Sequence, residues 1–396
     1  MLLIIMVQVL LTKGMNLMPS IGKTIKAELA KSKLAKKKLP PPWAGPQKDG
    51  VTQSLLNDYL FCRERFRIRV IDGLTVDEGF NARMEYGSMW HECEEVWAAG
   101  GSQNDWEDRL AKYSGKLIKA HRLEQADISK WMNICKHQFP IYVEFWKKST
   151  HVKNRTPLLQ EHTFKVPYKL PSGRTVFLRG KMDSVDLVKS GKKKFIWLQE
   201  NKTKGQFDEE SIVRRLQFDL QTLLYQTALD VVAKEHGWKE QIKGVCYNVI
   251  RRPLSGGKFS YRPHQATAKK PAEKMSDYYA RVGQAIKENP EHFFARWNAI
   301  ITKGDIKKFQ TQLLNPLLET LCDDYEWWDY CHHTSDDVYD YTLRGSCFPN
   351  QTPTHYRLPY GLWHPIAEGR DTGFDKYLDS GDSSGLVRVD SLFGEL

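Results

Sequence analysis

The feature that most constrains this chain is a short apolar strand, predicted at 195–198, that runs into a carboxylate and an amine, Glu200 and Lys202. Alternate residues of a strand share a face, so these two side chains are expected side by side. A second β-like run, 175–183, delivers another carboxylate, Asp183. Two acids beside a lysine suit metal-assisted phosphodiester hydrolysis, because carboxylates bind a hard cation and an ammonium stabilises negative charge on a phosphate. Glu-x-Lys alone also fits an exposed ion pair on a hairpin. The neighbouring motifs are therefore needed to distinguish an ion pair from a metal-dependent site.

The alternation of apolar and polar residues predicts that the strands carrying Asp183 and Glu200 belong to a meander. Three β-like runs at 158–170, 174–189 and 194–202 are separated by glycine-containing turns. Asp183 would then lie near the end of one strand and the second carboxylate near the end of its neighbour. A further run, 244–250, is apolar on both faces, which predicts a strand in the interior of the sheet.

Apolar residues at helical spacing predict helices on both sides of the strands in the sequence. The expected helical segments are 52–62, 81–99, 103–150, 208–235, 272–288 and 305–330. In the second of them, Gly87 lies one turn before His91 and leaves room around the imidazole. A lone histidine is nonetheless more often a core or surface residue.

The helix predicted at 208–235 carries Gln217, Gln221 and Tyr225 at intervals of four residues, and therefore on one face. The simpler interpretation of such a polar stripe is a solvated face. Amides and a tyrosine are, however, unusual choices for a surface compared with Glu and Lys. They suit contacts to phosphate and to a catalytic lysine.

Composition narrows the class of partner. The 396 residues are 41% hydrophobic and 27% charged, which is ordinary for a globular chain, and the net charge of +11 favours an anionic partner such as nucleic acid. Much of that charge lies in residues 1–50, which hold nine lysines against two acids. Seven cysteines without a C-x-x-C pair argue for a reducing compartment. The apolar opening, 1–11, is too short to span a bilayer and lacks the basic flank of a signal peptide, so we expect a cytoplasmic protein without a membrane partner.

Taken together, these motifs resemble the PD-(D/E)XK nuclease superfamily, and most closely its RecB-like branch, which includes phage exonucleases and CRISPR-adaptation exonucleases. The segments that carry the resemblance occur in the order of that branch, and they are Cys62-x-x-x-Phe66 after its helix, Gly87-x-x-x-His91, Gly180-Lys181-Met182-Asp183, Glu200-Asn201-Lys202-Thr203, Gln221-x-x-x-Tyr225 and Tyr247–Pro253. Each motif alone is weak evidence for the superfamily, but the occurrence of all of them in this order is specific.

The resemblance implies an α/β fold with a restriction-endonuclease-like core, in which helices flank a central mixed β-sheet, plus helical N- and C-terminal elaborations. We predict a basic, flexible arm at 1–50, the nuclease core at 51–260, a mainly helical part packed on the core at 261–370, and a flexible tail at 371–396.

The resemblance also implies roles for individual residues. The metal ligands would be His91, Asp183, Glu200 and the carbonyl of Asn201, holding Mg²⁺ or Mn²⁺. Lys202 would be the catalytic lysine, and Gln221 and Tyr225 would position it or the phosphate. Gln217, Arg251 and Arg252 are the predicted DNA contacts.

One departure from the branch concerns iron. Many relatives hold a [4Fe–4S] cluster with one cysteine before the histidine motif and three close together near the C-terminus. Cys62 fits the first position, but Cys322, Cys331 and Cys347 are too widely spaced for the other three, so no cluster is expected.

The implied activity is a metal-dependent DNA exonuclease of phage or mobile-element recombination and repair, in a prokaryotic cell or an infected host. It would act on linear single- or double-stranded DNA, with a recombinase or a single-strand-binding protein as a possible partner. Two alternatives stay open. One is a structure- or sequence-specific endonuclease or nickase on the same site, and the other is a catalytically silent nucleic-acid-binding partner of a recombinase.

Overall fold

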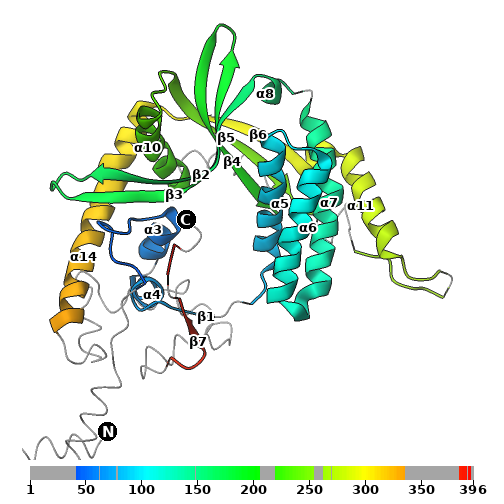
Figure 1. The fold of residues 1–396 in the computed structure, drawn as a ribbon, viewed down its shortest axis with the longest axis horizontal. Helices are drawn as coiled ribbons and strands as arrows, with labels where there is room; N and C mark the ends of the chain where they lie inside the picture. Colours follow the sequence, from blue (N-terminus) through cyan, green and yellow to red (C-terminus); the bar gives the residue numbers. More distant parts are fainter. Residues whose placement is uncertain are drawn as a thin grey trace, which may run out of the picture. The chain divides into compact units, whose positions relative to one another are not determined.

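A five-stranded mixed sheet forms the centre of the fold (Figure 1). The computed structural model describes residues 42–61, 63–76, 79–147, 149–205, 219–253, 262–268, 270–334, 383–389 and 391–393. The strands, in their order across the sheet, are β2 (Arg155–Lys169), β3 (Thr175–Ser190), β4 (Lys193–Lys204), β5 (Gln241–Arg251) and β6 (Phe294–Ile300). Among neighbours in this five-stranded sheet of the described residues, only β4 and β5 are parallel. The predicted meander and the interior position of β5 are both confirmed.

The sheet divides at β3. This strand pairs with β2 over almost its whole length, but with β4 only from Ser184 to Ser190. Beyond that point β4 continues to Lys204 beside β5. Figure 1 shows the far part of the β2–β3 hairpin leaving the other strands. Asp183 is the first residue of β3 past the division.

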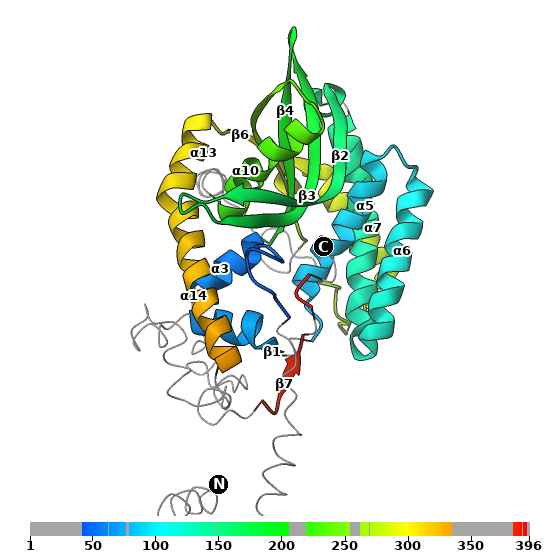
Figure 2. The ribbon, with the colours of Figure 1, turned by 60° about the vertical axis from the view of Figure 1, so that its left-hand side comes forward.

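Helices pack on both sides of the sheet (Figures 1 and 2). On one side lie α3 (Gln53–Phe61), α10 (Leu220–Glu235), α13 (Lys303–Phe309) and α14 (Asn315–Thr334). On the other lie α5 (Ala82–Ala98), α6 (Gln103–Ala120), α7 (Gln125–Lys147) and α11 (Met275–Glu288). The shorter elements are α4 (Arg63–Phe66), η1 (Arg67–Ile71), β1 (Leu74–Val76), η2 (Arg122–Glu124), α8 (Thr150–Lys153), α12 (Pro290–Phe293), η3 (Gln310–Leu314) and β7 (Leu386–Arg388).

Each helical layer has its own apolar core. One cluster joins Ile196 and Leu198 of β4 to Leu224 of α10 and Leu318 of α14. A second, aromatic cluster is centred on Trp90 and holds α5, α6, α7 and α11 together. The restriction-endonuclease-like α/β class is therefore confirmed. None of the described helices is both long and apolar enough to cross a membrane.

Helix α10 begins later than predicted. Asp219 has an extended backbone, and its carboxylate accepts a hydrogen bond from the backbone N–H of Thr222, so the first turn is capped there. A continuous helix from 208 to 235 was therefore wrong. Gln217 and its neighbours from 206 to 218 lie outside the described residues.

Three further predictions need correction. Strand β6 was not foreseen, because its seven residues follow directly on the short helix α12. Trp43 is fully buried in the main core, so the fold begins before residue 51 and the arm predicted at 1–50 is too long. In the predicted flexible tail, β7 pairs with β1 from Leu386 to Arg388.

The β5–β6 pairing depends on a glycine. A Cβ atom on Gly244 would overlap the backbone carbonyl oxygen of Ala299 on β6. We therefore expect Gly244→Ala to lower the free energy of unfolding by about 3 kcal/mol, since the two strands would have to separate. Gly115→Ala is the control, because a Cβ at this helical position meets nothing within 4 Å and should raise stability by about 0.5–1 kcal/mol. Urea unfolding of both variants measures the difference, and equal stabilities would contradict this account of the strand pairing.

Candidate active site

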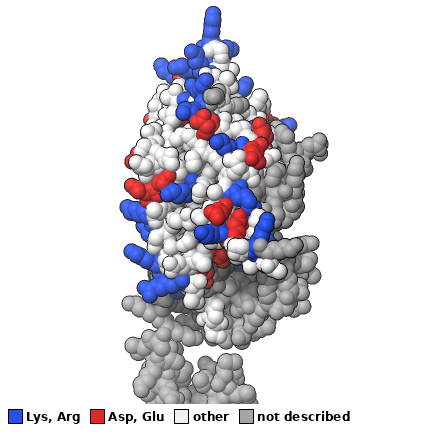
Figure 3. Space-filling view, turned by 90° about the vertical axis from the view of Figure 1, so that its right-hand side faces the viewer, with Lys and Arg blue, Asp and Glu red and all other residues white. Residues whose placement is uncertain are grey.

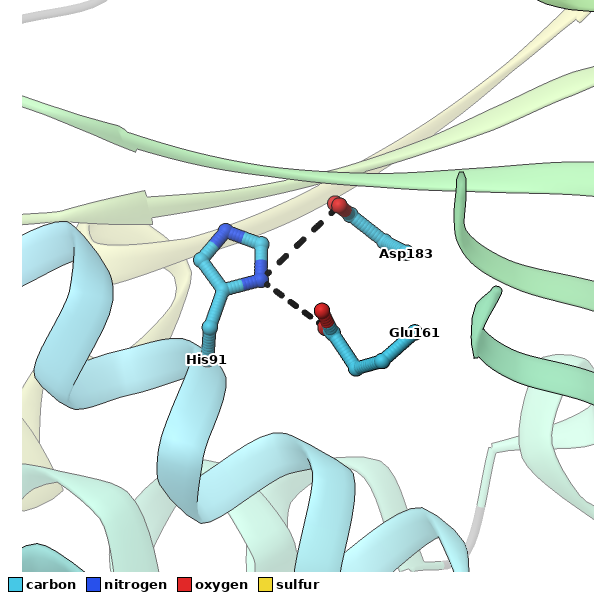
Figure 4. Close-up of side chains that lie close together, drawn as sticks. All are labelled: His91, Glu161 and Asp183. Carbon is cyan, nitrogen blue, oxygen red and sulfur yellow. Dashed lines mark hydrogen bonds and ion pairs between the residues drawn. The ribbon is translucent and has the colours of Figure 1, made fainter. Parts of the chain in front are cut away.

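An imidazole and two carboxylates meet where the sheet divides (Figure 4). His91 Nδ1 on α5 lies 3.3 Å from Oε1 of Glu161 on β2 and 3.9 Å from Oδ1 of Asp183 on β3. One ligand atom from each of the three lies within 4.8 Å of the others. The structure thus brings His91 to Asp183, as predicted, and adds an acid that the sequence analysis missed.

Glu161 lies opposite Asp183 on the neighbouring strand, between the pairs Gln160–Ser184 and His162–Met182. It has a φ of 46°, the left-handed region that residues other than glycine seldom adopt. Its second oxygen, Oε2, pairs with Lys181 Nζ at 2.6 Å. No motif marked this position, and its one sequence signal is a carboxylate directly opposite Asp183 in a meander.

The electrostatics of these groups are coupled. Burial alone would lower the pKa of His91, but the carboxylates of Asp183 and Glu161 raise it to about 9. Burial raises the pKa of Asp183, opposed by His91 and by the backbone N–H of Asn201, which donates to Asp183 Oδ2 at 2.7 Å. His91 is therefore an imidazolium that pairs with these acids, and it would release this proton on binding a cation as a neutral ligand.

The second group of side chains is a triangle on β4 and α10. Glu200 Oε1 lies 2.6 Å from Lys202 Nζ and accepts a hydrogen bond from Gln221 Nε2 at 2.8 Å. Lys202 Nζ in turn donates to Gln221 Oε1 at 2.7 Å. Burial, and next the charge of Asp183, raise the pKa of Glu200 to about 7. The predicted pairing of the acid and the amine on one strand face is present, and Gln221 contacts both.

The lysine is held as an ammonium. Burial would lower the pKa of Lys202, but the adjacent Glu200 and then Asp183 raise it overall. A protonated Lys202 cannot act as a base and is suited to stabilising negative charge.

Tyr225 lies one turn beyond Gln221 on α10, next to the site. Its ring meets Phe164 edge-on with centroids 5.3 Å apart, and a Cβ on Gly180 would lie 2.8 Å from that ring. Burial, and then the charge of Glu200, raise the pKa of its hydroxyl. Gly180 is therefore required to admit the tyrosine, which links two of the motifs sterically.

The contacts of Asn201 and Gly87 are also defined, and the carbonyl of Asn201 stays a predicted metal ligand. The side chain of Asn201 accepts a hydrogen bond from Asn248 Nδ2 at 2.8 Å, so the part of Asn201 nearest the acids is its backbone. A Cβ on Gly87 would come within 3.2 Å of Thr203 Oγ1, so this glycine permits α5 to approach β4 rather than making room around the imidazole.

The predicted DNA contacts have intramolecular partners. Arg251 Nη1 lies 3.3 Å from His292 Nδ1, and Arg252 Nη1 donates to the carbonyl of Arg83 at 2.8 Å. Their role in binding DNA stays a prediction. The described residues do not include Cys62, Cys347 or the side chain of Cys331. The expectation that the chain holds no iron–sulfur cluster is therefore untested.

The donor set of His91, Glu161 and Asp183 fits a divalent cation. Two carboxylates and one imidazole are ligands that Mn²⁺ accepts, and Mg²⁺ binds through the oxygens. Burial raises the pKa values of Asp183 and Glu200, and the charge of Asp183 adds to the shift at Glu200, so a bound cation would stabilise both carboxylates.

A family model for the PD-(D/E)XK nuclease superfamily matches residues 51–332. The chain belongs to this superfamily. The match includes all the predicted site residues, from His91 to Arg252. Among curated proteins, none matches the chain with significant similarity.

Removing a carboxylate should weaken binding of the cation. We expect Glu161→Gln to reduce Mn²⁺ affinity at least about tenfold, because affinity follows the number of charged ligands. Titration calorimetry with Mn²⁺ measures this. Glu92→Gln is the matched control, since Glu92 lies next to His91 in the sequence but pairs with Arg109 instead. Unchanged Mn²⁺ affinity in Glu161→Gln would exclude Glu161 as a ligand.

Proposed function

We propose that this PD-(D/E)XK protein is a Mg²⁺- or Mn²⁺-dependent deoxyribonuclease that degrades linear DNA as an exonuclease. The observation that carries the proposal is the position of Lys202, a protonated ammonium held by Glu200 and Gln221 next to a cluster of acids. Family membership supports phosphodiester hydrolysis, and the formal charge of +11 supports a polyanionic substrate.

His91, Glu161 and Asp183 would hold the cation, with Glu200 and the carbonyl of Asn201 as further candidates. When bound, the cation supplies Lewis acidity at the phosphate. Lys202 stabilises the negative charge that develops on the phosphate oxygens, and Gln221 fixes the direction of its ammonium. Tyr225 supports this arrangement by packing against Gly180.

The biological setting follows the resemblance to the RecB-like branch. Recombination or repair of phage or mobile-element DNA in the cytoplasm of a prokaryotic cell would supply linear substrates. A recombinase or a single-strand-binding protein is the proposed partner. Gln217, Arg251 and Arg252 remain the candidates for contacts to the DNA backbone.

Variants of the acid and of the lysine test the proposed chemistry. Asp183→Ala should abolish Mg²⁺-dependent release of nucleotides from end-labelled DNA. Lys202→Ala should lower kcat by about 10²- to 10³-fold while leaving Mn²⁺ affinity unchanged, because the ammonium stabilises charge but is not a ligand. Lys239→Ala, at an exposed lysine, is the control for lysine removal. Full activity in Asp183→Ala or Lys202→Ala would refute the site.

The form of the DNA distinguishes an exonuclease from the alternatives. We expect linear single- or double-stranded DNA to be degraded and covalently closed circles to resist, since an exonuclease needs an end. Equal rates on closed circles would identify an endonuclease or nickase instead. Binding of DNA in EDTA without cleavage in Mg²⁺ or Mn²⁺ would identify a silent binding protein.

A further inference from the structure

The sheet has a cavity of about 240 Å³ on the face that points away from the catalytic lysine. Trp197 and Gln199 of β4 line this cavity. Glu200 and Lys202 alternate with them and contact Gln221 on the opposite face. The cavity is therefore separated from the acid cluster by the thickness of the sheet.

Most of the charged residues that line the cavity are basic. Its charged lining residues in the described part of the chain are Arg155, Lys189, Lys243 and Arg296, with Asp186 as the single carboxylate. Asp186 is buried, pairs with Arg155 Nε at 3.6 Å and accepts a hydrogen bond from the Ser184 hydroxyl at 2.8 Å. The buried carboxylate of Glu94 on α5 also interacts with both arginines. Two acids thus face the four cations, and a net positive charge remains.

Both guanidinium groups retain N–H donors. The Arg155 side chain is only 7% exposed and donates from Nη1 to Gln199. Arg296 donates from Nε to Asn248 at 3.1 Å and from Nη2 to Tyr142 at 2.9 Å. Within the described residues, no hydrogen bond uses Nη2 of Arg155 or Nη1 of Arg296. Guanidinium donors fixed in this way are suited to the oxygens of a phosphate.

The positive charge continues outside the cavity. Lys189 lines the cavity and is itself exposed, and the turn from β3 to β4 with the start of β4 adds Lys192, Lys193 and Lys194, all exposed. Figure 3 shows Lys and Arg side chains gathered at the top of the molecule, over this turn. No acid interrupts residues 189–194. An extended polyanion could contact the turn and the cavity together.

We propose that this cavity binds a backbone phosphate of a nucleic-acid strand, as an accessory site distinct from the catalytic site. This rests on the nucleic-acid substrate proposed above. At about 240 Å³ the cavity is smaller than the roughly 300–1,000 Å³ pockets that enclose whole small ligands, which favours one group of a long ligand over a complete nucleotide. Trp197 beside the arginines offers an aromatic surface for a neighbouring base.

Lysine footprinting tests the site without requiring catalysis. The full chain in EDTA is acetylated with and without a 30-nucleotide single-stranded DNA, and modification at each lysine is measured by mass spectrometry. We expect the DNA to protect Lys189 and Lys243, but not Lys307 and Lys308, which are exposed on α13. Parallel samples with inorganic phosphate or a deoxynucleoside monophosphate separate a strand from a small anion.

A double variant supplies the energetic test. Lys189→Gln with Lys243→Gln should lower the slope of log affinity against log salt by about 1.4, since each contact to a single strand contributes about 0.7. Lys307→Gln with Lys308→Gln removes the same charge and should leave the slope unchanged.

The outcomes are distinct. Protection by the small anions but not by the strand, or no protection at all, overturns the accessory site, as does an unchanged salt slope in the Lys189/Lys243 variant. Protection by the strand in a protein that cleaves no DNA supports the accessory site while contradicting the proposed nuclease function.

Discussion

The hydrogen bond from the backbone N–H of Asn201 to the carboxylate of Asp183 joins the two halves of the divided sheet. Regular pairing of β3 with β4 ends at Ser184 and Gln199. One step further, a side chain takes the place of the missing strand partner. The same carboxylate lies beside His91, so one residue satisfies a backbone donor and contributes to the acid cluster. The geometry of the acid cluster and the irregularity of the sheet therefore have a common origin.

Such a concentration of acids is stable only if each has a partner, because an unpaired buried charge is costly. Glu161 pairs with Lys181, Glu200 pairs with Lys202, and Asp183 lies beside the imidazole of His91. Compensation is incomplete, since the pKa of Glu200 is still raised to about 7 by burial and by Asp183. The remaining repulsion between Glu200 and Asp183 is one that a bound cation would reduce.

Strand periodicity was sufficient to predict the parts of this site that lie on regular elements. Lys202 follows Glu200 at the spacing of a strand face, and Gln221 reaches both from a helix. Glu161 was missed because its importance arises from a local left-handed backbone and from strand register, and neither leaves a motif in the sequence. The role of Gly87 was misjudged for a related reason: its neighbour is Thr203, more than a hundred residues away in the chain.

The start of α10 shows the limit of helical periodicity. Apolar spacing continued through the residues before Leu220, but the capping carboxylate of Asp219 determines where the helix begins. Strand β6 was missed because a strand of seven residues has too few alternations of apolar and polar side chains to be recognised between helices.

A buried polar network behind the sheet explains how groups from distant elements hold their positions. The Tyr142 hydroxyl of α7 donates to Glu94 at 3.0 Å and accepts from Asn248 at 2.6 Å. Asn248 also donates to the side chain of Asn201. Glu94 follows His91 by three residues on α5, and Asn201 lies between Glu200 and Lys202 on β4. Because hydrogen bonds are directional and these groups are shielded from water, the network fixes the histidine-bearing helix against the lysine-bearing strand from the face opposite the chemistry.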